Sequence, residues 1–196
     1  IAGTNMEDNK NKKLVAYHEV GHAIIASLLE NHEEVEKISL IPRGGSRGST
    51  WYEPNEEQSL VSRAELLARI TSTLGGRVTE QIIFGDPEVT NGASNDLQQV
   101  TSIARQMVTR YGMSSLGPIV FEDENGEDGL DLDSNETLAN RIDIEVCKIV
   151  NHCESIATKI IIDNRIIIDL AVERLLDIET LDGEDFRELV KQYTVL

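Results

Sequence analysis

The sequence predicts a mainly α-helical domain of the α+β class, with a small β-sheet or hairpin in the N-terminal third. Three observations lead to this prediction. Apolar residues recur at helical spacing along most of the 196 residues, whereas the alternation typical of a strand is confined to residues 35–41. Hydrophobic residues make up 40% and charged residues 27% of the chain, as in an ordinary globular protein. This length allows one domain or two small ones, with enough chain to bury a substantial core.

The first predicted helix runs from about Lys12 to Leu29. Its large apolar residues recur at helical spacing with small residues between them: Val15, Ile24, Ile25 and Leu28. A helix this apolar around its polar positions is expected to be buried.

The most informative motif, His18-Glu19-Val20-Gly21-His22, lies inside this helix. Residues four apart share one helix face, with Cβ atoms roughly 5–6 Å apart, so both imidazoles can reach one metal ion. Glu19 can approach a water molecule bound to that metal. This HExxH spacing is typical of zinc hydrolases, in which the two His bind zinc and the Glu is the general base. The alternative, a surface helix that happens to carry two His, conflicts with its apolar neighbours.

A hairpin or small sheet is predicted after this helix. Residues 35–41 alternate and end at Pro42, a loop covers residues 43–48, and residues 49–52 form a short extended piece that stops near Pro54. The extended piece offers an edge to which an extended polypeptide could add as a further strand, a mode that reads backbone rather than sequence. A strand already paired within the protein explains the pattern equally well.

Helices account for most of the remaining chain. The capping box Ser62-Arg63-Ala64-Glu65 begins one of them, and Gly75-Gly76 allows a close contact or a break. Ser94 or Asn95 is the expected N-cap of the helix that stops at Gly112. The acidic segment 122–133 has no periodicity and is expected to be an exposed, mobile loop. The expected helical ranges are 62–74, 77–83, 96–110, 135–163, 165–177 and 183–193.

Charge and cysteine content exclude several classes of protein. The formal net charge of −17 argues against a nucleic-acid partner, because phosphate binding needs clusters of Lys and Arg. No apolar run approaches the roughly 18 residues of a membrane span, and residues 1–13 are too polar for a signal peptide. The start at Ile1 suggests a fragment of a longer protein. Cys147 and Cys153 lack a CxxC motif and are expected to be reduced core residues, in a reducing compartment.

A catalytic zinc ion takes three protein ligands and keeps one position for water, so the motif needs a third ligand. Residues 23–31 contain no His, which excludes an HExxHxxGxxH pattern; His32 is expected in an exposed loop and His152 on a polar surface. A carboxylate is therefore expected. Asp96 begins a helix after a Gly-bearing turn, and Glu80 lies on a helical stretch. Each residue also has an explanation without a metal. Acidic residues are favoured at helix N-termini, which would account for Asp96, and Glu80 could be an ordinary solvent-exposed charge on a helix. The residues alone therefore favour Asp96 as the third ligand only slightly.

Several short motifs follow one another along almost the whole chain. They are Tyr17 to Ala23, Leu74 to Arg77, Phe84-Gly85, Thr90 to Asp96, Ala104 to Thr109, Tyr111 to Ser114, Arg141 to Asp143, Asn164-Arg165 and Glu179 to Gly183. In this order they resemble the peptidase domain of FtsH-type AAA-plus proteases. Asn91 stands where that family commonly has Thr. The stretch Ser115-Leu116-Gly117-Pro118 is one residue shorter than in many bacterial members, which is similar to chloroplast and cyanobacterial forms.

This resemblance implies one helical zinc-peptidase domain over residues 1–196, with the zinc site within 12–112, an acidic loop at 122–133 and a helical part at 134–196. It implies one zinc ion held by His18, His22 and Asp96, with Glu19 as the general base. Glu80 would then support the site or the fold. The implied activity is that of an ATP-dependent zinc metalloprotease, a homo- or hetero-hexamer that cleaves unfolded membrane and soluble polypeptides.

Other features are expected only of the parent protein. The chain has no GxxxxGK[ST] loop, so ATP is expected to act in a separate ATPase module, and a membrane only through segments absent here. The parent is expected in the plastid thylakoid facing the stroma, or in a bacterial inner membrane facing the cytoplasm, and this fragment is expected to be soluble.

Two alternatives stay open. The first is a non-catalytic pseudo-peptidase ring that serves as an assembly or chaperone platform; it predicts a missing ligand or base, and none is missing. The second is a stand-alone zinc peptidase of unrelated fold, whose third ligand would be Glu80 or another carboxylate.

Overall fold

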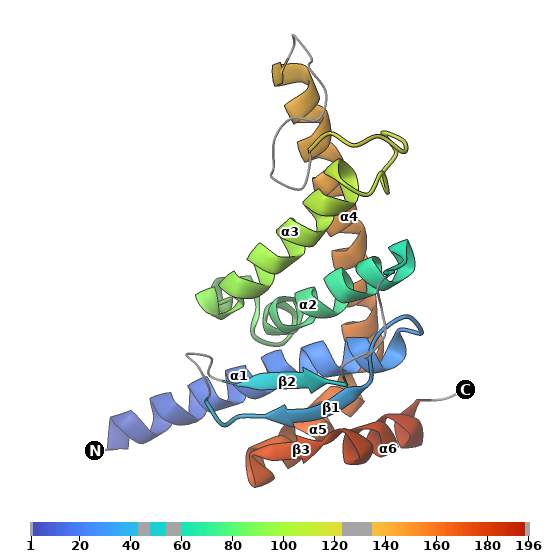
Figure 1. Ribbon diagram of the computed structural model, residues 1–196. Coiled ribbons are helices and arrows are strands. Elements are labelled where there is room, and N and C mark those ends of the chain that lie inside the picture. The colour runs from blue at the N-terminus through green and yellow to red at the C-terminus, as the bar shows by residue number, and fades with distance from the viewer. Residues whose placement is uncertain (1, 43–47, 54–59, 123–134, 195–196) are drawn as a thin grey trace.

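A computed structural model describes residues 2–42, 48–53, 60–122 and 135–194 (Figure 1). The predicted mainly helical α+β fold is confirmed. The helices are α1 (Ala2–Leu28), α2 (Arg63–Phe84), α3 (Ser94–Thr109), α4 (Asn135–Asp163), α5 (Arg165–Ile178) and α6 (Gly183–Tyr193). The strands are β1 (Val35–Ser39), β2 (Ser49–Tyr52) and β3 (Thr180–Asp182), and two short 3₁₀ turns, η1 (Asp86–Glu88) and η2 (Asn91–Ala93), lie between α2 and α3.

Two glycines let α1 and α2 cross at close range. A Cβ atom on Gly75 would lie 2.5 Å from the backbone oxygen of Gly21, and one on Gly21 would lie 2.6 Å from the backbone oxygen of Gly75. Because both obstacles are backbone atoms, any side chain at either position would push the helices apart. Helix α2 continues without interruption through Gly75-Gly76. The close contact expected at this pair is therefore correct, and the alternative of a helix break is wrong.

The three strands form one antiparallel sheet in the order β2–β1–β3, so β2 lies at an edge. Ile38 of β1 pairs with Thr50 on one side and with Leu181 on the other. The predicted hairpin is correct. The sequence does not predict β3, because three residues directly before a helix are too few to show alternation.

Two helix starts differ from those that the sequence predicts. Helix α1 begins at Ala2 rather than near Lys12. Residues 8–11 are exposed, so they carry no apolar period by which a helix could be recognised. Helix α3 begins at Ser94, with Ala93 as its N-cap and no capping side chain, so neither Ser94 nor Asn95 has the expected role. The capping side chain belongs to the preceding turn instead, where Thr90 Oγ1 accepts the N–H of Gly92 at 3.1 Å.

Other expectations concern the C-terminal half. The capping box at Ser62 and the helix break at Asn164 are found as predicted. Cys153 is buried, but Cys147 is exposed on α4, so the core assignment is wrong for Cys147; both thiols are free. Of the acidic segment 122–133, residues 123–133 lie outside the described residues. Glu122 itself forms an ion pair with Arg105 at 2.6 Å.

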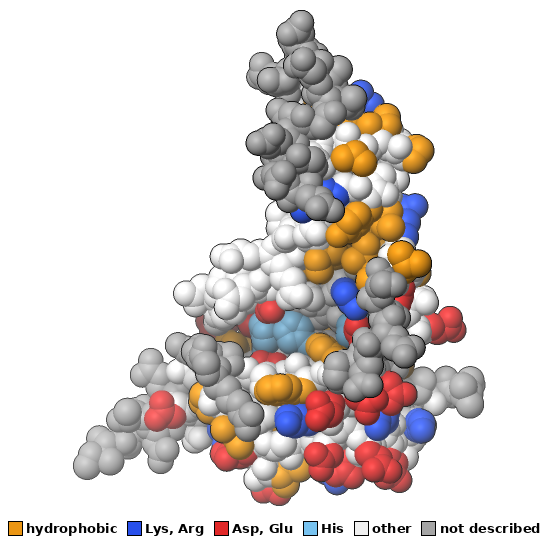
Figure 2. Space-filling view, in the orientation of Figure 1, with side chains coloured by type: hydrophobic (Ala, Val, Ile, Leu, Met, Phe, Trp, Pro, Cys, Tyr) orange, Lys and Arg blue, Asp and Glu red, His pale blue; other side chains and the backbone are white. Residues whose placement is uncertain are grey.

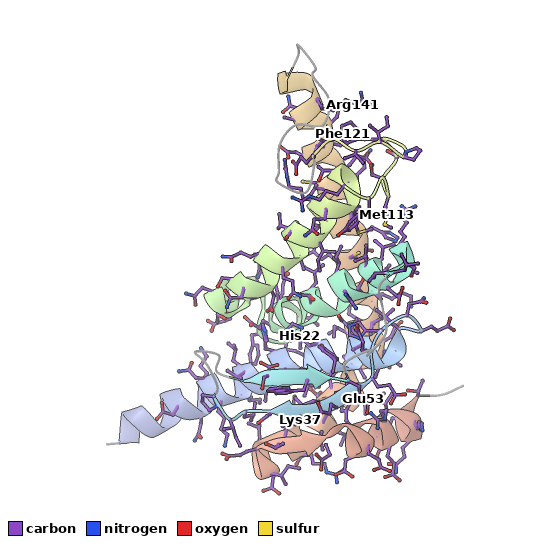
Figure 3. All side chains as sticks on the ribbon, in the orientation of Figure 1. His22, Lys37, Glu53, Met113, Phe121 and Arg141 are labelled. Carbon is purple, nitrogen blue, oxygen red and sulfur yellow. The ribbon has the colours of Figure 1, made fainter. Side chains whose placement is uncertain are left out.

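The hydrophobic core lies between the helices and against one side of the sheet: α1, α5 and α6 pack against the strands, while α2, α3 and α4 pack against one another. Helix α4 runs behind α2 and α3 and packs against both of them (Figure 1). Figure 3 places His22 beside the helix crossing and above the strands, whereas Met113, Phe121 and Arg141 lie toward the far end of α3 and α4. Within the described ranges, no helix is long and apolar enough to cross a membrane.

Candidate metal centre

Helix α1 presents His18 and His22 side by side. Their ring centroids are 4.7 Å apart and their Nε2 atoms 3.0 Å apart, as expected for residues one helical turn apart. Gly76 of α2 makes room for this pair, because a Cβ atom there would lie 2.5 Å from the ring of His18. The glycine pair of α2 therefore serves both the helix crossing and the site.

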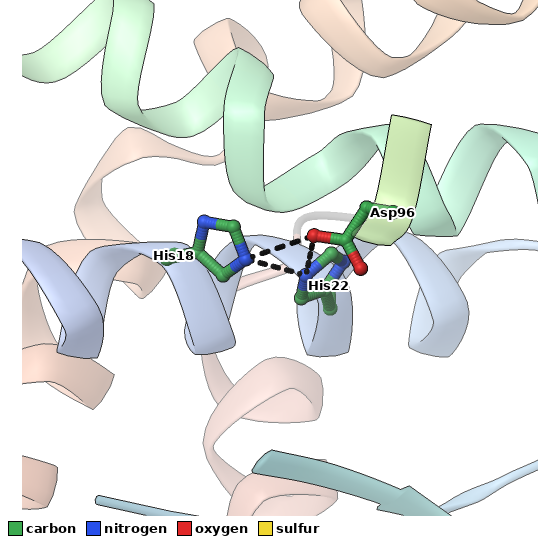
Figure 4. A group of neighbouring side chains, drawn as sticks. All are labelled: His18, His22 and Asp96. Carbon is green, nitrogen blue, oxygen red and sulfur yellow. Dashed lines mark hydrogen bonds and ion pairs between the residues drawn. The ribbon is translucent and has the colours of Figure 1, made fainter. Parts of the chain in front are cut away.

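Asp96 reaches the same point from the first turn of α3 (Figure 4). Its Oδ2 atom lies 3.2 Å from Nε2 of His18 and 3.6 Å from Nε2 of His22. Ligand atoms at about 2.0–2.2 Å from a tetrahedral zinc ion are about 3.3–3.6 Å from one another. The triangle formed by these three atoms has sides close to those values, so His18, His22 and Asp96 fit one zinc ion.

The other ring nitrogens of the two His are already engaged. Nδ1 of His18 donates to Glu80 Oε1 at 2.7 Å, and Nδ1 of His22 donates to the backbone oxygen of Ser72 at 2.8 Å. Such partners set the tautomer and the ring orientation of a metal-binding His. Both Nε2 atoms are thereby left to face Asp96 and the position that suits a metal ion.

Glu80 is buried and lies on the opposite side of the His18 ring from Asp96, which excludes it as a partner of the Nε2 pair. Its Oε2 atom accepts from the backbone N–H of Thr90 at 3.0 Å and from the Thr90 hydroxyl at 3.1 Å. Burial raises the pKa of Glu80, but the hydrogen bonds from His18 and Thr90 outweigh it and lower the pKa. The alternative that Glu80 is an exposed helix charge is therefore wrong; it orients His18.

The electrostatics of the site favour positive charge. Burial lowers the pKa of His18, but hydrogen bonds to Asp96 and Glu80 outweigh it and raise the pKa to about 9. Burial likewise raises the pKa of Asp96, while its hydrogen bonds to His18 and His22 hold it well below its usual range. The carboxylates that favour a protonated His18 would equally favour a bound metal cation.

The site opens into a cleft of about 850 Å³ between α1, β2, α2 and the start of α3. Figure 2 shows the His side chains at the bottom of this hollow. Glu19 lines the cleft next to His18, and its Oε2 atom accepts a hydrogen bond from the Thr50 hydroxyl at 2.9 Å. The HExxH spacing thus places a carboxylate beside the three candidate metal-binding groups.

His32 also lines the cleft, which contradicts its expected place in an exposed loop. Its side chain is only 3% exposed, and its Nε2 atom lies 2.6 Å from the Ser72 hydroxyl. The ring packs edge-on against Tyr52 with centroids 4.9 Å apart. Both contacts join residues distant in sequence, so no local pattern could have shown them. His152 is exposed, as expected.

Comparison with known proteins identifies the family of this chain. The sequence profile described as Peptidase family M41 matches residues 5–189. The chain belongs to this peptidase family.

The chain is similar to FtsH proteins over almost its whole length, which confirms the predicted resemblance to FtsH-type proteases. It is 59% identical, over 100% of its length, to the ATP-dependent zinc metalloprotease FtsH of Trieres chinensis, of which it covers 32%. It is 49% identical, over 99% of its length, to the chloroplastic ATP-dependent zinc metalloprotease FTSH 6 of Arabidopsis thaliana, of which it covers 29%. The FtsH of Heterosigma akashiwo is 44% identical over 100% of the chain and 31% of its own length. The chain therefore spans about a third of the relatives that it matches.

Proposed function

We propose that this chain is the proteolytic domain of an ATP-dependent zinc metalloprotease and hydrolyses peptide bonds of unfolded membrane and soluble proteins. The observation that carries the proposal is the convergence of His18 Nε2, His22 Nε2 and Asp96 Oδ2, within 3.0–3.6 Å of one another, beside Glu19. The names of the M41 relatives, all zinc metalloproteases, support zinc as the metal.

His18, His22 and Asp96 would hold one zinc ion per chain. When bound, zinc would supply a water molecule with a pKa near 7 and polarise the scissile carbonyl. Glu19 takes a proton from the attacking water and delivers it to the leaving amine, so one carboxylate acts first as base and then as acid. Glu80 and the Ser72 carbonyl keep the two imidazoles in the tautomer that the metal requires.

The substrate chain would pair with the outer edge of β2. This strand lies at the edge of the sheet, and Ser49, Thr50 and Tyr52 line the cleft that holds the site. Pairing through backbone hydrogen bonds needs an extended polypeptide and little side-chain specificity. An unfolded protein meets that requirement, whereas a folded one does not.

The activity of the whole protein would involve the two thirds of the relatives' length that this chain does not cover. The names of those relatives include ATP dependence, and the present sequence has no GxxxxGK[ST] loop. ATP hydrolysis and membrane attachment would therefore reside elsewhere in the parent, a hexamer of the plastid thylakoid or of a bacterial inner membrane. A non-catalytic platform is disfavoured, since such a role needs neither Glu19 nor three converging ligands.

Three variants test the proposal. Glu19→Gln should keep about one zinc ion per chain but lower casein cleavage by roughly 10²–10⁴-fold, the usual contribution of general acid–base catalysis. Asp96→Ala should lose zinc and cleavage together. Glu80→Ala should weaken zinc binding about 10–100-fold without abolishing it, as loss of an outer partner does. Turnover near the wild-type rate by zinc-loaded Glu19→Gln, or complete zinc loss in Glu80→Ala but not in Asp96→Ala, would contradict the assignment.

A further inference from the structure

Gly48, directly before β2, and Thr50, within β2, lie close to the side chain of Glu19. The hydroxyl of Thr50 lies 2.9 Å from Glu19 Oε2 and 3.0 Å from the Glu19 backbone oxygen. Thr50 thus reaches both the carboxylate and the helix that carries it. Glu19 is buried, with only 8% of its surface exposed, although its carboxylate borders the cleft.

Gly48 lies close to the same side chain. A Cβ atom at Gly48 would be 2.9 Å from both Cγ and Oε1 of Glu19, and 2.7 Å from Cγ1 of Val15. The φ angle of Gly48 is not in the left-handed region, so its backbone does not require glycine. The absence of a side chain at Gly48 is explained by the space that Glu19 occupies.

We propose that Gly48 and Thr50 are positioning residues that hold the Glu19 carboxylate in its orientation toward the metal centre. This inference rests on the proposed function, in which Glu19 is the general base. A Glu side chain has three rotatable bonds, and helix α1 restricts them only near the backbone. Gly48 leaves open the space that the Glu19 side chain occupies, and the Thr50 hydroxyl donates a hydrogen bond to one carboxylate oxygen. Together they favour one orientation of the carboxylate.

Such restriction matters because a general base must lie within about 2.6–3.2 Å of the proton that it removes. A misplacement of about 1 Å can lower a rate about 100-fold. The strand proposed to pair with the substrate would then also orient the base. Substrate register and base orientation would be set by the same residues, 48–52.

A purely structural role for these residues makes a different prediction. The Thr50 hydroxyl also contacts the backbone oxygen of Glu19, so it could serve only to attach β2 to α1. In that case Thr50→Val would lower stability and leave the turnover of the remaining folded protein unchanged. Rate and stability must therefore be measured on the same preparations.

The test compares kcat and KM for cleavage of an unfolded casein peptide by zinc-loaded variants of this chain. Thr50→Val should lower kcat about 10-fold, and Gly48→Ala up to about 100-fold, with KM within about twofold and zinc content unchanged. Thr50→Ser, which keeps the hydroxyl, should restore most of kcat. The matched control is Thr180→Val. Thr180 lies on β3, at the opposite edge of the same sheet, and its hydroxyl is 3.0 Å from Ser39 Oγ of the central strand β1. This substitution should leave kcat unchanged.

Wild-type kcat in both Thr50→Val and Gly48→Ala, or a fall in kcat as large in Thr180→Val as in Thr50→Val, would overturn the inference. If Gly48→Ala does not fold, the comparison of kcat between Thr50→Val and Thr50→Ser still tests the inference. A wild-type chain that binds zinc but cleaves nothing would contradict the proposed function instead. Crystal structures of the wild type and Thr50→Val then decide the inference separately: a displaced Glu19 carboxylate supports it and an unchanged one overturns it.

Discussion

Helix α1 presents His18 and His22 from one buried face, whereas Asp96 comes from the first turn of α3, 78 residues from His18. The two His are supported by helix packing, since α2 crosses α1 at Gly21 and Gly75 with no room for a side chain. The Asp96 side chain is 25% exposed and follows a short 3₁₀ turn. One part of the site is therefore held by close packing and the other by a few hydrogen bonds.

The hydrogen bonds of the second part converge on Glu80. Its carboxylate contacts His18 on one side and Thr90 on the other, and Thr90 in turn caps the turn that leads into α3. Glu80 is thus the link between the two parts. This difference predicts that changes at the helix crossing mainly affect stability, whereas changes at the turn mainly affect metal binding.

The largest effect is expected at the crossing. Gly75→Ala would place a Cβ atom 2.5 Å from the backbone oxygen of Gly21, which cannot move without separating the helices. Overpacking of this kind costs about 1–3 kcal/mol of the free energy of unfolding, measurable by urea denaturation. Gly92→Ala is the matched control in the turn, where the nearest atom is Thr90 Oγ1 at 3.1 Å. A smaller loss of stability in Gly75→Ala than in Gly92→Ala would invalidate the comparison.

A smaller effect is expected at the turn. Thr90→Val removes the hydroxyl that donates to Glu80 Oε2 and accepts from Gly92, while the backbone contact to Glu80 remains. Zinc affinity should fall about 10-fold, because an outer partner of a metal-binding His is weakened. Competition against a chromophoric chelator measures this change. Thr90→Ser keeps the hydroxyl and should bind zinc as the wild type does; equal losses in both variants would rule out a role for the hydroxyl.

The smallest expected effect concerns His32. This residue contacts Ser72 of α2 and so belongs to the part of the site that is held by helix packing. Burial lowers its pKa below the ordinary 6.5, so the unfolded chain gains a proton at higher pH than the folded chain. The contribution of His32 to the free energy of unfolding should therefore decrease as the pH falls below 6.5, whereas the raised pKa of His18 acts in the opposite direction. Urea denaturation of the metal-free protein between pH 7.5 and 5.5 should show less of this decrease in His32→Gln. His152→Gln, which removes an exposed His, is the control, and equal slopes for His32→Gln and wild type would contradict the assignment.

Local sequence patterns predict much of this fold and the His18–His22 pair of the candidate site. Apolar periodicity identifies α4, α5 and α6, the capping box marks the start of α2, and four-residue spacing puts His18 and His22 on one face. β3 is too short for a pattern, and the exposed start of α1 has no apolar face. His32 looks like a loop residue because its partners, Ser72 and Tyr52, are distant in sequence.

The sequence alone determined the helices and the HExxH pair, because both depend on interactions within a few residues of one another. Without the family resemblance, it left Asp96 and Glu80 as nearly equal candidates for the third ligand. Only the tertiary structure shows where each of them lies: Asp96 is at the Nε2 side of His18 and Glu80 is at the Nδ1 side. That outcome depends on how α1, α2 and α3 pack, and packing between distant segments leaves no periodic trace in the sequence.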